Sequence, residues 1–218
     1  MLVTSTEEKI RAMLESTNRE GMIDLIGYMM QEGFFESPAS TRFHGCFKGG
    51  LAEHSLGVYE ILKQLIGNKK MDEPVGAGQK PFPVTEESII IAALCHDVCK
   101  IGAYTGDGPA YQWNRKQPKG HAVLSIERIS KHIKLEPIED MMIRYHMGVY
   151  GCNEFYEGEG KDGEYPIRSD HSECEGMTKE ESQAFRYGKS LANAWYHNPI
   201  VKLMYFSDEL ETMESKLK

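Results

Sequence analysis

Hydrophobic residues recur along most of this chain at intervals of three and four positions, and few segments alternate as β-strands do. This spacing predicts helices over residues 6–15, 22–32, 51–66, 86–102, 121–133, 137–147 and 178–218, the last with a break at Asn198-Pro199. Gly, Pro and aromatic residues between positions 103 and 120 predict a short β-hairpin around 111–114. The pattern therefore predicts an all-α bundle with one small hairpin.

The helix that follows Thr85 differs from the others, because its first turns are apolar on nearly every side. Thr85 is a typical N-cap residue, and Glu86 and Glu87 suit the positive end of the helix dipole. A helix that is apolar all round lies inside a protein. We expect this segment to be buried.

Three segments are predicted as loops. Residues 34–50 contain Pro38 and the pair Gly49-Gly50, residues 69–83 are rich in Gly, Pro and charge, and residues 149–176 are irregular and acidic. We expect the loop 149–176 to flank the active site, because structureless stretches of that length are usually functional or disordered. The chain of 218 residues is predicted to be one domain, with N-terminal helices in 1–33 and a metal-binding core in 34–208.

Composition and charge narrow the classes of function. The formal net charge is −8, whereas proteins that bind long nucleic acid usually present a basic surface. A small phosphorylated substrate, such as a nucleotide or a short single-stranded nucleic acid, fits this charge better. The chain has no apolar window of membrane-spanning length, a polar N-terminus and an odd number of cysteines. These features predict a cytoplasmic protein that does not enter a membrane, and they leave its oligomeric state open.

Residues of metal-ligating type are spread along the predicted helices. They are His54, His96, Asp97, His121, His146 and Asp208. Imidazole and carboxylate groups suit first-row transition metals such as Mn, Fe, Co, Ni or Zn. Each histidine alone would have an ordinary interpretation as a hydrogen-bonded core residue or a helix cap. Together they predict one or two divalent transition metal ions.

Two of these residues share a helical face with apolar neighbours. His54 lies on the face of Val58 and Leu62, and Asp208 lies on the face of Val201 and Met204. A carboxylate that points inward needs a partner, and a metal ion would supply one.

Asp97 follows His96 at the end of the apolar run and is the natural bridging ligand, because a carboxylate has two oxygens to divide between ions. Two ions a few Å apart can activate a water and clamp the oxygens of a phosphoester. The residues therefore predict a metal-dependent hydrolase in which Asp97 is a catalytic residue.

The order H…HD…H…H…D and the segments GGLAEHSLGV, HDVCKIG, GHAVLSIERI and SDELET resemble the motifs of the HD-domain superfamily of metal-dependent phosphohydrolases. The segment SPASTRFHGCFKGGLAEHS is similar to the HD portion of a bacterial 3′–5′ exoribonuclease, without its OB domain. The resemblance spans roughly residues 34–208 and implies an HD-type helical fold. It also implies a nucleotide or short oligonucleotide as substrate, cleaved as a phosphohydrolase or phosphodiesterase would cleave it.

The resemblance also implies roles for single residues. His54, His96, Asp97 and Asp208 match the ligands of a first metal, and His121 and His146 match the pair that would hold a second with Asp97. Lys100 matches the lysine of the family's HD-x-x-K pattern, where a cation meets the substrate phosphate, so it is a catalytic and substrate-binding candidate. Cys99 stands where the family often has Gly, and Met147 where many members have a second His.

Further residues are candidates for contact with the substrate. His44 can line the pocket, and Lys48, Arg115 and Arg42 can orient the phosphate. The acid that protonates the leaving group is open among Glu53, His44 and His121. Cys95 and Cys99 are predicted to be small buried side chains rather than zinc ligands.

Two other classes of function share this ligand set. Some proteins with a similar fold use a mixed-valence di-iron centre to oxygenate small polyols or phosphonates, and a non-catalytic nucleotide-binding protein would need a metal only for binding or stability. Metal analysis with oxygen uptake separates the first class from a hydrolase. Tight nucleotide binding without turnover identifies the second.

Overall fold

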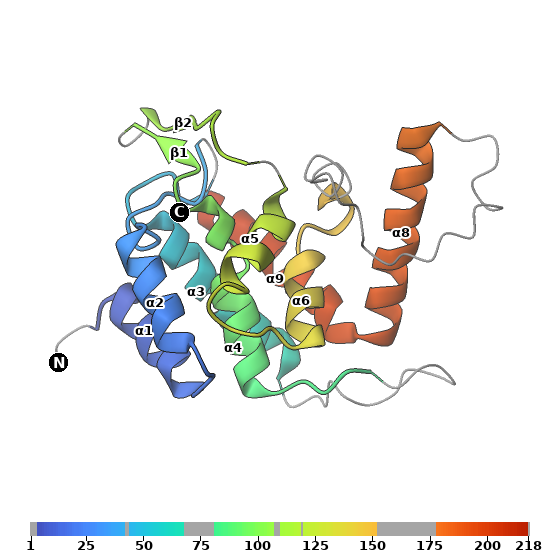
Figure 1. Ribbon diagram of the computed structural model, residues 1–218, viewed down its shortest axis with the longest axis horizontal. Helices are drawn as coiled ribbons and strands as arrows, with labels where there is room; N and C mark the ends of the chain where they lie inside the picture. Colours follow the sequence, from blue (N-terminus) through green and yellow to red (C-terminus); the bar gives the residue numbers. More distant parts are fainter. Residues whose placement is uncertain are drawn as a thin grey trace.

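The computed structural model describes residues 4–41, 44–67, 81–106, 110–118, 120–151 and 178–217. These residues form a helical bundle with a two-stranded sheet at its edge (Figure 1), which confirms the predicted all-α class. The helices are α1 (Thr6–Ser16), α2 (Met22–Gln31), α3 (Gly50–Ile66), α4 (Glu86–Cys95), α5 (His121–Ile129), α6 (Pro137–Arg144), α8 (Lys179–His197) and α9 (Pro199–Leu217). Short 3-10 helices, η1 (Val98–Lys100) and η3 (Gly148–Tyr150), follow α4 and α6.

Helix α4 lies at the centre of the bundle. Its N-terminus is capped as predicted, because the Thr85 hydroxyl accepts a hydrogen bond from the backbone N–H of Ser88 at 3.1 Å. Every residue from Ser88 to Cys95 is buried, and α1, α3 and α6 pack around the helix. A helix with neighbours on all sides needs no polar face, which explains its uniformly apolar composition.

Three helices end earlier than the hydrophobic spacing predicts. Helix α4 ends at Cys95 rather than near residue 102, α5 at Ile129, and α6 at Arg144. The apolar residues that follow, such as Val98, Ile101 and Ile133, remain buried in turns. Because a buried turn and a buried helix leave the same apolar pattern in a sequence, the pattern could not locate these ends. The difference matters, because the chain leaves the helix at Asp97, with φ −106° and ψ 18°.

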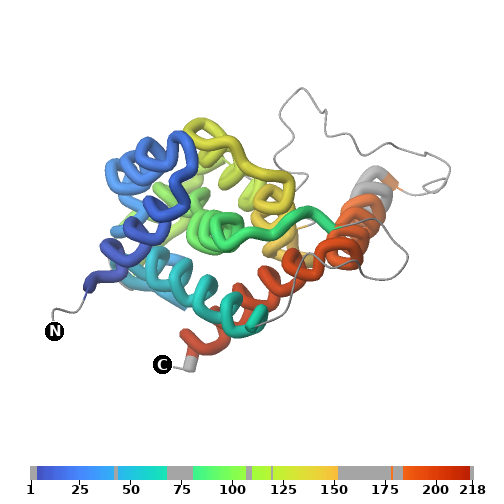
Figure 2. The backbone as a smooth tube through the Cα atoms, turned by 90° about the horizontal axis from the view of Figure 1, so that it is seen from below, coloured from blue at the N-terminus to red at the C-terminus, as the bar shows by residue number. Residues whose placement is uncertain are grey.

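Helices α3 and α9 lie along each other on one side of the bundle (Figure 2). Helix α8 stands at the right-hand side of Figure 1 and packs on α9 and η3. The predicted break between the last two helices is confirmed at Asn198. Pro199 begins α9, a position where the missing N–H costs nothing, and the buried Asn198 side chain accepts a hydrogen bond from the Phe82 N–H at 3.0 Å.

The predicted hairpin is confirmed as strands β1 (Tyr104–Thr105) and β2 (Gln112–Trp113), which pair antiparallel. Residues 34–49 form turns and irregular backbone where they are described. The predicted loops 69–83 and 149–176 fall largely outside the described residues, although Val149 and Tyr150 belong to η3 rather than to a loop. Among the helices described, none is long and apolar enough to cross a membrane.

Candidate metal centre

The predicted ligands come together from five parts of the fold. His54 lies on α3, His96 and Asp97 follow α4, His121 begins α5, His146 follows α6, and Asp208 lies on α9. The side chains of His54, His96, Asp97 and His146 are buried, and those of His121 and Asp208 are each 14% exposed. His96 keeps helical backbone dihedrals directly after α4, whereas Asp97 and His146 lie beyond the ends of α4 and α6.

The two oxygens of Asp97 face different histidines. Oδ2 lies 3.5 Å from His54 Nε2 and 3.4 Å from His96 Nε2. Oδ1 lies 2.6 Å from His121 Nε2 and 3.7 Å from His146 Nε2. The carboxylate is therefore shared between two sets of imidazole nitrogens, which is the arrangement that a bridging ligand requires.

Asp208 joins the set on the Oδ2 side of Asp97. Its Oδ1 lies 3.1 Å from His54 Nε2 and 3.9 Å from His96 Nε2. Two ligand atoms that share one ion at roughly 2.1 Å each lie about 3.0–3.4 Å apart. The separations in this set match or slightly exceed that spacing, so small movements would bring all the donors onto one ion.

The other ring nitrogen of these histidines is occupied, which fixes the direction of Nε2. His96 Nδ1 donates to the Ala93 carbonyl at 2.9 Å, and His146 Nδ1 donates to the Ile143 carbonyl at 2.6 Å. Because a carbonyl can only accept, Nδ1 carries the hydrogen and Nε2 of the neutral ring keeps a free lone pair. A backbone or carboxylate partner at the second nitrogen is the usual support for a metal-ligating histidine.

Several of the inward-facing polar atoms have no aligned hydrogen-bond partner among the described residues. They are His54 Nε2, His96 Nε2, His146 Nε2 and Asp97 Oδ1. Burying such atoms without a partner is costly, so native proteins rarely leave them unpaired. One small region with four of them fits a cation at their centre, and the nitrogen and oxygen donors suit a divalent transition metal.

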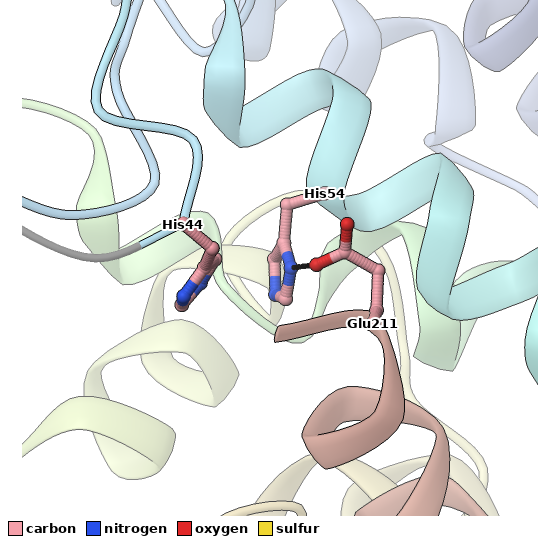
Figure 3. Close-up of side chains that lie close together, drawn as sticks. All are labelled: His44, His54 and Glu211. Carbon is pink, nitrogen blue, oxygen red and sulfur yellow. Dashed lines mark hydrogen bonds and ion pairs between the residues drawn. The ribbon is translucent and has the colours of Figure 1, made fainter. Parts of the chain in front are cut away.

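Glu211, which the sequence reasoning did not include, supports His54 from behind. Figure 3 shows its carboxylate meeting Nδ1 of His54, and this nitrogen donates to Oε2. Ser215 Oγ donates to the other carboxylate oxygen. Gly57 makes room for the side chain, because a Cβ there would lie 2.8 Å from Glu211 Cγ. The available signal was the position of Glu211 one turn after Asp208 on α9.

The pKa values of the side chains in this cluster depend strongly on the charges of their neighbours. Burial opposes a charge on His54, but the nearby carboxylates of Asp208, Asp97 and Glu211 outweigh it and raise the pKa of the imidazole well above its usual value. Burial likewise opposes ionisation of Asp97, yet Lys100, His96 and His121 bring its pKa well below the usual range. The carboxylates are thus ionised and draw positive charge to the centre.

His146 behaves differently from His54. Burial, with His96 close by, lowers the pKa of its imidazole to about 3, so this ring is neutral near neutral pH. A neutral imidazole with a free Nε2 is ready to act as a ligand without losing a proton.

A pocket of about 470 Å³ opens onto the group of six predicted metal ligands, which we call the metal cluster. Asp97, His121 and Asp208 line one part of it, together with Lys100, whose ammonium lies 2.6 Å from Asp97 Oδ2. His44 also lines the pocket, and its ring centroid lies 4.7 Å from that of His54. Figure 3 shows the two rings side by side. Both ring nitrogens of His44 are buried, and neither has a hydrogen-bond partner in the part of the chain that the structure describes.

Other predicted substrate-binding residues lie away from the pocket wall. Lys48 is exposed and pairs with Glu36 at 2.8 Å, and Arg115 is exposed in the turn after β2. Glu53, one candidate acid, is exposed on α3. None of the three is among the residues that line this pocket. Arg42 lies outside the described residues. Of the other predicted substrate-binding residues, the structure brings Lys100 and His44 to the cluster, but not Lys48 or Arg115.

The two cysteines near His96 take different roles. Cys95 is buried, and burial raises the pKa of its thiol to about 12, as expected for a small apolar side chain. Cys99 is also buried, but its Sγ lies 3.1 Å from His121 Nδ1. Cys99 therefore contacts a predicted ligand, which the sequence reasoning missed. Met147, the residue after His146, lines the pocket.

The fold and the cluster together define a helical protein with buried histidines and aspartates suited to divalent metal ions. The sequence model of the HD domain family matches residues 51–174, which is more than half of the chain. The chain therefore belongs to the HD domain family, whose members are generally metal-dependent hydrolases. The match includes all the predicted ligands except Asp208. No curated protein and no solved structure matches the chain significantly. The similarity to the exoribonuclease stays a prediction.

Proposed function

We propose that this protein is a metal-dependent phosphoric ester hydrolase that acts on a nucleotide or a short oligonucleotide. One or two divalent transition metal ions would be held by the following residues: His54, His96, Asp97, His121, His146 and Asp208. The observation that supports the proposal most strongly is the placement of Asp97, whose Oδ2 and Oδ1 each face two imidazole Nε2 atoms. Membership of the HD family supports the same class of reaction.

When bound, such ions supply an acidified water and positive charge for the phosphate oxygens. The side chains of the chain itself hold the substrate beside this centre. Lys100 lines the pocket with its ammonium next to Asp97 Oδ2, so it can hold a phosphate oxygen at that position. Burial, His54 and Lys100 lower the pKa of His44 to about 4, and the neutral ring can donate one hydrogen bond and accept another.

The size of the pocket supports a small substrate. A volume of about 470 Å³ is within the range of roughly 300–1,000 Å³ that holds small ligands, and a mononucleotide or the end of a short strand is of this size. The net charge of −8 also disfavours long nucleic acid, which needs an extended basic surface. We therefore favour cleavage at a terminal phosphoester over cleavage within a long duplex.

The test is a panel of phosphomonoesters and phosphodiesters, nucleotides included, assayed with Mn, Co, Ni, Fe and Mg in turn. We expect hydrolysis of at least one substrate by the native protein and none by Asp97→Asn. The matched control is Asp140→Asn, which changes a surface aspartate paired with Arg144 on α6 and should leave the activity unchanged. Equal activity in Asp97→Asn and native protein would remove Asp97 from the mechanism.

The same panel separates the other functions that share this ligand set. Oxygen uptake and a coupled di-iron signal in the iron-loaded protein, without phosphoester hydrolysis, would identify an oxygenase. Tight nucleotide binding without turnover under any metal would identify a nucleotide-binding protein. Either result would replace the hydrolase proposal.

A further inference from the structure

The hairpin β1–β2 places two aromatic side chains at the pocket that opens onto the metal cluster. Tyr104 and Trp113 are direct cross-strand partners, with ring centroids 5.7 Å apart and ring planes at 78°. Both line the pocket, and Trp113 is nevertheless 50% exposed. The half-exposed ring of Trp113 thus presents apolar surface at the pocket wall, where an aromatic side chain can pack against a ligand.

The fold holds this aromatic pair in place. The Tyr104 hydroxyl donates to the Ala39 carbonyl at 3.3 Å, which ties the hairpin to the segment before α3. Asn114, directly after Trp113, donates from its backbone N–H to the Ala103 carbonyl at 2.8 Å and from its side chain to the Gly102 carbonyl at 2.9 Å. Figure 1 shows the hairpin at the outside of the helical body. The Asn114 bonds join the two ends of the hairpin, and the Tyr104 bond ties its first strand to the segment before α3. Strand pairing and these bonds thus hold the two rings next to each other at the pocket wall.

The pocket therefore has two chemically different parts. One part contains carboxylates and imidazoles of the metal cluster with the ammonium of Lys100, and the other contains the rings of Tyr104 and Trp113. A ligand that suits both parts has a phosphate at one end and a flat, apolar face at the other. A base of a nucleotide has such a face, and stacking on an aromatic side chain tolerates any base because every base has a π-face.

We infer that Trp113, supported by Tyr104, is the stacking subsite for the base of a nucleotide whose phosphate meets Lys100 and the metal cluster. This inference rests on the proposed function for the phosphate end of the substrate. Base stacking on one aromatic residue changes affinity by about ten- to a hundredfold. Trp113 is thus the residue that distinguishes nucleotides from phosphorylated compounds without a base.

The test compares two hydrolysis-resistant probes on metal-loaded protein by calorimetry: the 5′-phosphonate analogue of AMP, and ribose 5-phosphonate, which lacks only the base. We expect native protein to bind the first at least about tenfold more tightly. Trp113→Leu should lose most of this preference, and Trp113→Phe should keep most of it. Binding of ribose 5-phosphonate and metal content should change in neither variant, which excludes a general structural defect.

The matched control is Tyr196→Leu, which removes an aromatic ring that is 55% exposed on α8 and does not line the pocket. The inference is overturned if native protein does not prefer the AMP analogue, if Trp113→Leu keeps the preference, or if it weakens both probes equally, as a sugar contact would. Failure of the proposed function looks different. In that case the preference depends on Trp113 while no phosphoester is hydrolysed with any metal.

Discussion

The carboxylate of Glu211 accepts a hydrogen bond from Nδ1 of His54, a residue 157 positions earlier in the chain. This contact leaves His54 Nε2 facing Asp97 and Asp208, and no described residue is an aligned hydrogen-bond partner for that nitrogen. A carboxylate behind a histidine of this kind fixes the tautomer and makes the ring a better ligand. We therefore propose that Glu211 positions His54 for metal binding rather than acting as a ligand in this arrangement.

Replacement of Glu211 should weaken metal binding in graded steps. Glu211→Ala removes the acceptor, and we expect metal affinity to fall by roughly 10–100-fold, the usual effect of losing such a partner. Glu211→Gln keeps an oxygen that can accept the hydrogen bond, so its loss should be smaller. Competition with a chromophoric chelator measures both. Glu214→Gln, an exposed position on the same helix, is the control, and equal affinity in Glu211→Ala and native protein would contradict the role of Glu211.

Gly57 offers an independent route to the same contact. Gly57→Ala places a Cβ about 2.8 Å from Glu211 Cγ, so the carboxylate must shift away from His54. We expect weaker metal binding even though alanine favours a helix over glycine by about 1 kcal/mol. Gly27→Ala on α2 meets nothing within 4 Å and should stabilise the fold without changing metal affinity. Metal titration beside urea unfolding checks both, and unchanged metal affinity in Gly57→Ala would count against this account.

His44 should affect the substrate and not the metal. Its ring lies beside His54 and lines the pocket, and neither of its nitrogens bonds to any residue that the structure describes. His44→Phe keeps a flat ring but removes both nitrogens, so we expect a higher KM for the phosphoester with unchanged metal content. His44, His54 and Glu211 also lie close enough to hold an ion together. Loss of one metal equivalent in His44→Phe would therefore show that His44 is a ligand.

Metal binding should release protons and strengthen as the pH rises. Burial opposes the charged form of His54 and His121. Neighbouring groups, including Asp97, nevertheless raise the pKa of both rings well above the usual value. Both rings are therefore protonated near neutral pH without metal. An ion that takes the lone pair must displace that proton, so raising the pH favours binding. Calorimetry in two buffers of different ionisation enthalpy measures the release. Affinity that is independent of pH between about 6 and 8 would show that these rings are already neutral.

A buried ion pair far from the metal centre should contribute strongly to stability. Arg19 donates two hydrogen bonds to the fully buried carboxylate of Glu139, at 3.0 and 2.7 Å. Arg19→Ala leaves that carboxylate without its cation, which should cost about 3–5 kcal/mol in the free energy of unfolding. Arg11→Ala, which breaks an exposed pair with Glu7, should cost less than about 1 kcal/mol. Urea unfolding compares them, and similar losses in the two variants would be evidence against a special role for Arg19.

The residue order alone was enough to predict the helices, the cap at Thr85 and the break at Pro199. These depend on local spacing and on the preferences of single residues, which do not need the rest of the fold. The ligand types His54, His96, Asp97, His121, His146 and Asp208 were also visible, because a carboxylate or an imidazole on an apolar face needs a partner wherever it lies. The ends of α4 at Cys95 and of α6 at Arg144 were not predictable, since the buried turns that follow continue the apolar pattern.

Only the tertiary structure decided which donor atoms face one another. Residues from different elements meet where the two Asp97 oxygens face separate histidines, where Glu211 contacts His54, and where Cys99 contacts His121. The pocket between the metal cluster and Trp113 is likewise lined by residues from several elements. Such distances follow from how α3, α4, α5, α6 and α9 pack and where they end. Hydrophobic spacing predicts which face of a helix is buried. The packing of the whole chain determines which other helix contacts that face.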